Sequence, residues 1–114
     1  MRSDDIVQII PHLYISNWDT SNNPVELKKN NIRAIISIET TLKSHWIIKY
    51  YDVNKISHMY IHIGDTPNEN ISSYFDTTYS FIDYYISRGQ NVLVHCMAGI
   101  SRSSTIILNS MIGA

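Results

Sequence analysis

The sequence has a single cysteine, Cys96, among its 114 residues, together with only four glycines and three prolines. One cysteine can form neither an intramolecular disulfide nor a cysteine-rich zinc site, and it suits a reducing compartment. No apolar run is long enough to cross a bilayer, and the five histidines show no paired spacing of the H-E-x-x-H kind. These absences exclude a disulfide scaffold and predict a protein that works without a metal or another cofactor.

The sequence also lacks an excess of either positive or negative charge. Nine lysines and arginines against ten aspartates and glutamates give a formal net charge of -1, and no basic run is interleaved with aromatic residues. The electrostatic footprint of a nucleic-acid-binding protein is therefore missing. Residues 1–5 include two aspartates where a signal peptide is basic, and residue 2 is not the glycine that myristoylation requires. We expect a protein of the cytoplasm or nucleus that binds neither nucleic acid nor a membrane. The abundance of isoleucine, asparagine, tyrosine and lysine is typical of proteins from an AT-rich genome, such as that of a virus or parasite.

With 44% hydrophobic residues, a chain of this length can bury one core, so residues 1–114 are predicted to form a single domain. Apolar or β-branched runs between breaker residues predict strands, and apolar residues at helical spacing predict helices. The predicted strands are 7–10, 13–16, 34–38, 59–63 and 91–95, and the predicted helices are 25–29, 44–50, 71–86 and 103–111. This order predicts an α/β domain in which helices flank a central, mostly parallel sheet.

The stretch 92–104 carries the strongest chemical signal. It places Cys96 at the end of a predicted buried strand and Arg102 in the first turn of a predicted helix, with the small residues Ala98 and Gly99 between them. Unpaired backbone N–H groups and the positive end of the helix dipole lower the pKa of a cysteine in such a place from roughly 8.5 toward 4 to 7. The same N–H groups and the planar arginine fork can bind phosphate oxygens. Nucleophile and anion site are thus one loop, suited to thiolate attack on phosphorus.

This stretch resembles the H-C-x5-R-S signature of the cysteine-based protein tyrosine phosphatases, and residues 98–103 are most similar to the dual-specificity branch, which includes the MAP kinase phosphatases. The resemblance extends upstream to 11–16 and through Gly64-Asp65 to the long helix, so that it covers nearly the whole chain. It implies a phosphate-binding loop between the last strand and a helix. It also implies a protein phosphatase that hydrolyses phosphotyrosine and phosphoserine or phosphothreonine through a phosphocysteine intermediate.

The resemblance assigns roles to individual residues. Cys96 is the nucleophile, Arg102 is the phosphate clamp, and Ser103 is the hydroxyl that assists release of the cysteine from phosphate. The general acid is expected about thirty residues before the cysteine, on a loop that precedes the long helix, and Asp65 is the aspartate that fits. His95 is expected to orient the loop and tune the thiolate, pointing away from the nucleophile on the alternating strand. Substrate-binding residues are then Met97, Ala98, Gly99, Ile100, Ser101 and Arg102, and no metal is involved.

Competing interpretations exist for some of these residues. A lone cysteine in an apolar strand is usually a small buried hydrophobe, but the neighbouring histidine, glycine, serine and correctly spaced arginine favour catalysis. Asp65 would otherwise be a turn residue. Asp76 and Asp83 are predicted on the solvated face of the long helix. The sequence identifies no partner for His12, His45, His58 and His62.

Two alternative functions use the same loop. Phosphoinositide phosphatases of the superfamily tend to place lysine in it, so the neutral Met97 and Ile100 favour a phosphorylated protein as substrate. A phosphatase acting on RNA 5′ ends or lipids would need basic residues around the mouth. A phosphate-binding module without turnover would usually have lost the cysteine or the arginine.

The last segment of the sequence predicts self-association. Residues 105–112 are apolar on most of their surface, and related catalytic domains continue into further helices that cover this region. An exposed apolar patch commonly marks a subunit interface. We therefore expect a two-fold homodimer formed through this C-terminal helix region.

Overall fold

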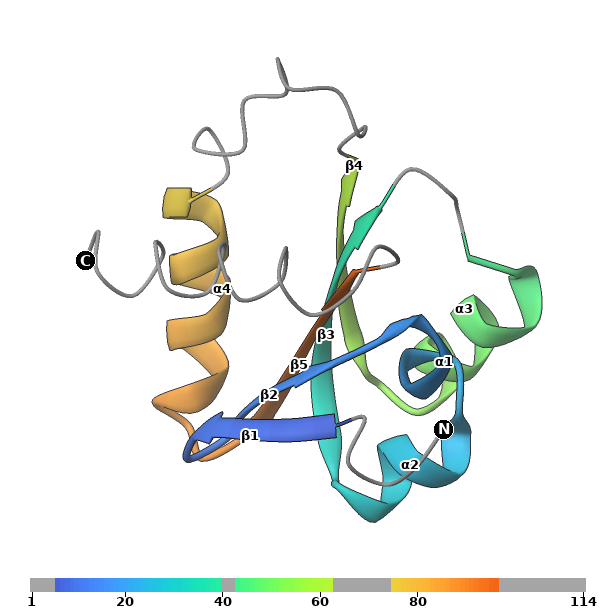
Figure 1. Ribbon diagram of the computed structural model, residues 1–114, viewed down its shortest axis with the longest axis horizontal. Helices are drawn as coiled ribbons and strands as arrows, with labels where there is room; N and C mark the ends of the chain where they lie inside the picture. The colour runs from blue at the N-terminus through green and yellow to red at the C-terminus, as the bar shows by residue number, and fades with distance from the viewer. Residues whose placement is uncertain (1–5, 40–42, 63–74, 97–114) are drawn as a thin grey trace.

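The computed structural model describes residues 6–39, 43–62 and 75–96, in which helices cover both faces of one sheet (Figure 1). The strands are β1 (Ile6–Ile10), β2 (Leu13–Ser16), β3 (Ile32–Glu39), β4 (Ser57–His62) and β5 (Asn91–Cys96). The helices are α1 (Trp18–Ser21), α2 (Pro24–Lys29), α3 (His45–Val53) and α4 (Phe75–Ile86). No helix in these ranges has the length and apolar character needed to span a membrane.

The sheet has the order β1-β2-β5-β3-β4. β1 is antiparallel to β2, whereas the pairs β2–β5, β5–β3 and β3–β4 are parallel. The predicted α/β class with a mostly parallel sheet is thereby confirmed. The β-branched run 34–38 lies in β3, which has a strand on either side, as its apolar character predicts.

The predicted strands are all present, with bounds that agree to within two residues. The predicted helix 44–50 begins at His45 and continues to Val53. Helix α4 is described from Phe75, and the predicted loop 97–101 and helix 103–111 lie outside the described residues. Helix α1 is an addition to the prediction.

Several helix ends are capped by nearby side-chain or backbone groups. The Asn23 side chain accepts hydrogen bonds from the first turn of α2, and Pro24 occupies its first position. After α4, Gly89 adopts a left-handed conformation with φ of 71°, and its N–H donates to the carbonyl of Ile86 at 2.9 Å. Helix α1 begins in the same way at Asn17, whose side chain accepts from the Thr20 N–H at 3.0 Å. Local hydrogen bonds thus mark the starts of α1 and α2 and the end of α4.

Side chains alternate between the two faces of the sheet. On the face covered by α4, which we call the α4 face, the buried core residues are Leu13, Ile15, Ala34, Ile36, Ile38, Ile61, Ile82, Val92 and Val94. On the face covered by α1, α2 and α3, which we call the α3 face, they are Leu27, Ile32, Ile35, Ile47, Tyr51, Ile56 and Leu93. Asp76 and Asp83 of α4 are exposed, which confirms their predicted place on its solvated side.

Candidate active site

Strand β5 brings Cys96 to the carboxyl edge of the sheet. Its backbone is the last of the strand and pairs with Ile38 of β3. The residues before it, Val92 to Val94, are completely buried between β2 and β3. The predicted position of Cys96, at the end of a buried strand, is therefore confirmed. This is the edge at which open α/β sheets bind their ligands.

The other catalytic and binding residues expected from the sequence stay predictions. They lie outside the described residues, as does the predicted dimer segment 105–112; they are Asp65, Met97, Ala98, Gly99, Ile100, Ser101, Arg102 and Ser103. The structure does describe the buried side chains that lie next to the end of β5 on the α3 face.

His95, next to Cys96, is completely buried on the α3 face. In the register of the sheet it lies between Ser16 of β2 and Ser37 of β3. Its Nε2 atom is 2.6 Å from Ser37 Oγ, and Trp18 of α1 makes an edge contact with its ring at a centroid distance of 5.9 Å. Burial first, and the charge of Lys43 second, lower the pKa of His95 well below 6.5. A buried neutral imidazole fits the supporting role expected of His95, which stays a prediction.

Ser37 also contacts a second histidine, His58 of β4. The His58 Nε2 atom lies 2.8 Å from Ser37 Oγ, so that one hydroxyl bridges the two rings. The His58 ring makes edge contacts with Tyr51 and Tyr60, at centroid distances of 5.1 and 6.5 Å. Burial and, to a lesser extent, the charge of Lys43 lower the pKa of His58 to about 4.

The partner of His58, Ser37, was not predicted from the sequence. A signal was nevertheless present, because the alternation of β4 puts His58 and Tyr60 on the face opposite Ile61. His12 also has a partner that was missed, since its Nδ1 atom is 2.8 Å from the Asn91 side-chain oxygen.

Lys43 places a positive charge beside this pair of histidines. It is only 7% exposed, and its ammonium group donates to Ser21 Oγ at 2.8 Å and to the Asn22 side chain at 3.1 Å. The same group lies 4.4 Å from the centre of the Trp18 ring, a cation–π contact. Tyr51 of α3 donates its hydroxyl proton to the Ser21 carbonyl at 2.6 Å. Helix α1 thus holds the lysine over the polar end of the α3 face.

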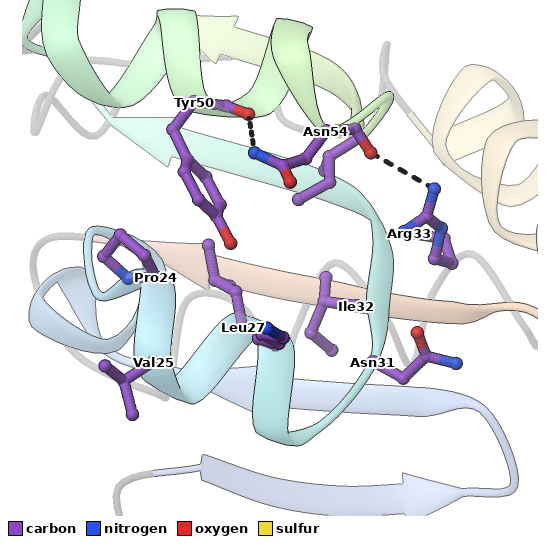
Figure 2. Close-up of a pocket in the computed structure, with 10 residues that line it drawn as sticks. Pro24, Val25, Leu27, Asn31, Ile32, Arg33, Tyr50 and Asn54 are labelled. Atoms are coloured by element: carbon purple, nitrogen blue, oxygen red, sulfur yellow. Dashed lines mark hydrogen bonds between the residues drawn. The ribbon is translucent and has the colours of Figure 1, made fainter.

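A cavity of about 540 Å³ lies at the opposite edge of the sheet, between α2, α3 and the start of β3 (Figure 2). There Arg33 donates to the Asn54 carbonyl at 3.2 Å. Ile32, which lines this cavity, pairs with the first residue of β5, whereas Ile38 pairs with Cys96. At roughly 3.3 Å per residue the two ends of β3 are about 20 Å apart, so this cavity is remote from the cysteine.

Another cavity, of about 520 Å³, opens on the polar end of the α3 face. It lies between α3 and β4, and its lining includes Lys43, His58 and Tyr60. This position makes His58 only partly buried, in contrast to His95.

Comparison with known proteins agrees with this geometry. Residues 13–112 match the family described as dual specificity phosphatase, catalytic domain. Dual specificity protein phosphatase 22 of Mus musculus is 31% identical over 101 residues, which are 89% of this chain and 51% of that protein. Tyrosine-protein phosphatase yvh1 of Schizosaccharomyces pombe is 35% identical over 104 residues, which are 91% of this chain and 30% of that protein.

A solved structure shows the same fold. The crystal structure of DUSP15 superposes with a TM-score of 0.77 and 32% identity, covering 90% of this chain and 61% of that one. The chain spans about half or less of the length of the curated relatives compared above. The matched family, the identity to its members and the shared fold show that this chain belongs to the dual specificity phosphatases.

Proposed function

We propose that this chain is a protein phosphatase that hydrolyses phosphotyrosine and phosphoserine or phosphothreonine through a phosphocysteine intermediate on Cys96. The observation that carries the proposal is the end of β5, where Cys96 ends a buried parallel strand at the ligand-binding edge of the sheet. The neighbouring His95 is buried and hydrogen-bonded. The sequence continues from there as H-C-x5-R-S in a chain that matches the family along most of its length.

The proposed reaction has two steps. In the first, the Cys96 thiolate attacks phosphorus, an S–P bond forms, and the P–O bond to the substrate breaks while Asp65 protonates the departing oxygen. Arg102 and the loop N–H groups stabilise the charge on the equatorial oxygens. In the second, the Asp65 carboxylate takes a proton from the water that attacks phosphocysteine, and Ser103 donates to the departing sulfur. Inorganic phosphate and the thiolate result, with no metal or cofactor in either step.

The sequence supports a protein substrate and a reducing compartment. The loop side chains Met97 and Ile100 are neutral, whereas a lipid or RNA substrate would call for basic residues there. A thiolate nucleophile needs reducing conditions such as those of the cytoplasm or nucleus. Self-association through residues 105–112 stays a prediction, and light scattering at micromolar concentration would test it.

Release of phosphate from an aryl phosphate and from matched phosphotyrosine and phosphothreonine peptides tests the proposal, with Cys96→Ser as the control. The wild-type protein should turn over all three substrates. The serine variant should lose turnover but still bind phosphopeptide, because Arg102 and the loop remain. Phosphopeptide binding without turnover by the wild type would instead identify a binding module.

The same assay separates the remaining alternatives. Turnover of phosphotyrosine peptide with strict rejection of phosphothreonine would remove the dual specificity. A lower KM for a phosphoinositide or an RNA 5′ end than for the peptides would contradict a protein substrate.

A further inference from the structure

Ser37 holds two histidine rings with one hydroxyl group. The Nε2 atoms of His95 and His58 lie 2.6 and 2.8 Å from its Oγ atom, both within hydrogen-bonding distance. The three residues come from adjacent strands, β5, β3 and β4. Because Ser37 is completely buried, its oxygen depends on these two rings rather than on bulk water.

A serine hydroxyl has one proton to donate, so it cannot donate to both rings. A neutral imidazole carries its proton on one nitrogen only. One ring must therefore accept from Ser37 at Nε2 and carry its own proton on Nδ1, while the other donates its Nε2–H to the serine oxygen. Two Nε2–H donors would leave the proton of the buried Ser37 hydroxyl without an acceptor at either contact, and burial and the nearby Lys43 disfavour an imidazolium in either ring at neutral pH.

The charges near each ring indicate which histidine is protonated at Nδ1 and which at Nε2. The Nδ1 atom of His95 is buried and has no hydrogen-bond partner among the described residues, and the next residue in the chain is Cys96. An N–H dipole stabilises a neighbouring thiolate or phosphate, whereas a lone pair repels it. The partly exposed His58 ring suits the other form, because the positive charge of Lys43 favours a lone pair and water can donate to it.

We propose that His58 is a positioning residue that acts through Ser37. It donates its Nε2–H to the serine oxygen, the serine hydroxyl donates to Nε2 of His95, and His95 is thereby held with its proton on Nδ1. The pairing follows from the two contacts at Ser37, and its direction rests on the proposed function, which places an anion beside His95.

The charged and titratable groups around His58 are compatible with a neutral ring that donates its Nε2–H to Ser37 at neutral pH. Tyr51 packs on its ring from α3, and Tyr60 packs on it from β4 itself. Across the adjoining cavity stand the charged or titratable groups of α3 and the segment before it: Lys43, His45, Lys49 and Asp52. His95 is the titratable group that faces Ser37 from the other side. Two lysines against one aspartate disfavour an imidazolium at His58.

Nitrogen-15 NMR of the imidazole groups at neutral pH tests the proposal directly, since bare and protonated ring nitrogens differ widely in chemical shift. The wild-type protein should show His95 protonated at Nδ1 and His58 protonated at Nε2. The opposite pair of forms, or the same form in both rings, would overturn the proposal. This readout needs no turnover, so failure of the phosphatase assay would contradict the proposed function and leave the positioning role to be decided by the spectrum.

Two variants of His58 separate positioning from packing. His58→Phe keeps an aromatic ring against Tyr51 but cannot donate, so His95 should populate both forms, and kcat should fall by about 10-fold at unchanged KM. The pKa of the Cys96 thiol, measured from the pH dependence of its alkylation, should rise in parallel. His58→Gln can donate to Ser37 again and should restore the His95 spectrum and most of the rate.

Equal losses in the phenylalanine and glutamine variants, or no change in either, would overturn the role of His58. Ser37→Ala removes the bridge without altering either ring and should reproduce the effect of His58→Phe. His45→Gln is the matched control, because it removes an exposed histidine that lines the same cavity and lies outside the bridge. A drop in rate as large as that of His58→Phe in this control would mean that surface charge, and not the bridge, is responsible.

Discussion

The two faces of the sheet both bury side chains, but those side chains differ in chemistry. The α4 face buries mainly hydrophobic side chains, around Ile36 and Ile82, with Thr78 of α4 as a buried polar residue. The α3 face buries a hydrophobic cluster around Leu93 and then, toward the carboxyl edge, Ser37 and His95. A buried polar group costs free energy unless it is hydrogen-bonded, so an apolar layer would be the simpler solution at this place. These buried polar residues, Ser37 and His95, lie next to the end of β5, where Cys96 is located.

This contrast predicts that the two faces of the sheet contribute differently to the stability of the fold and to the reaction. Hydrophobic side chains of the α4 face stabilise the fold in proportion to the area that they remove from water. Polar side chains at the carboxyl end of the α3 face contribute less to stability, and in our proposal they position His95 beside Cys96. Substitutions on the two faces should therefore change different measured quantities, and the residues of the loop beyond β5 should change activity alone.

The largest effect short of removing the nucleophile is expected for Asp65→Asn. This change should lower kcat by about 10² to 10⁴-fold for substrates with poor leaving groups and much less for good ones, because a proton is needed only when the departing oxygen is basic. The melting temperature should stay close to that of the wild type. A series of aryl phosphates with leaving groups of different pKa measures this, and an equal loss across the series would remove Asp65 from the general-acid role.

Ile82→Ala tests the α4 face. The side chain is 1% exposed in the core of that face, so its truncation should lower the free energy of unfolding by about 2 to 5 kcal/mol. The rate per folded molecule should be unchanged, since no polar contact behind Cys96 is altered. Urea denaturation measures the free energy of unfolding, and active-site titration combined with a rate assay gives the rate per folded molecule. Val53→Ala, at a side chain that is 68% exposed, is the control and should change stability by less than about 0.5 kcal/mol.

The pH dependence of stability tests the α3 face. The pKa of His58 is lowered to about 4 in the folded protein, so between pH 6.5 and about 4 the unfolded chain binds a proton that the folded chain does not. The free energy of unfolding should therefore be highest above pH 6.5 and fall as the pH decreases through this window. The contribution of His58 is about 2 kcal/mol, since water at its partly exposed ring reduces the full linkage value. His95, whose pKa is also lowered, adds to the same trend.

His58→Phe isolates that contribution. Carboxylates that titrate in the same range affect the variant and the wild type alike, so the difference between their urea midpoints belongs to the histidine. This difference should grow in favour of the variant as the pH falls from 6.5 to about 4. A constant difference across the window would show that His58 titrates normally in the folded protein.

The smallest effect is expected for Lys43→Met, which keeps an apolar stem and removes the charge. The pKa of His58 should rise from about 4 but stay below 6.5, because burial, the larger cause of its lowering, is unchanged. Histidine proton NMR signals followed against pH measure this. A lower pKa in the variant would contradict a repulsive action of Lys43 on the imidazolium.

Elements of this fold that depend on residues close together in the sequence can be predicted from it, whereas contacts between distant residues cannot. The strands and longer helices follow from local patterns: β3 is a run of β-branched residues, and α4 repeats apolar residues at helical spacing and ends at Gly89. Helix α1 was missed because four residues, W-D-T-S, have no apolar period, and only its Asn17 cap marks it.

The candidate site divides in the same way. Cys96 was found because its neighbours in the sequence share its chemistry. The bridge from His95 through Ser37 to His58 joins residues that are 58 and 21 positions apart, and it exists only once β5, β3 and β4 are aligned in register. No local pattern encodes such a contact, and Lys43 is held near the same place by Ser21 and Trp18 of α1.

The central claim is that Cys96 carries the phosphoryl group during turnover. Rapid acid quenching of the Asp65→Asn variant during reaction with an aryl phosphate should trap this intermediate, because loss of the base slows its hydrolysis. Mass spectrometry of the digested protein should then find one phosphoryl group on the peptide that contains Cys96, and none in the double variant that also carries Cys96→Ser. Turnover of the substrate with an unmodified Cys96 peptide, or a phosphoryl group on any other residue, would contradict the account.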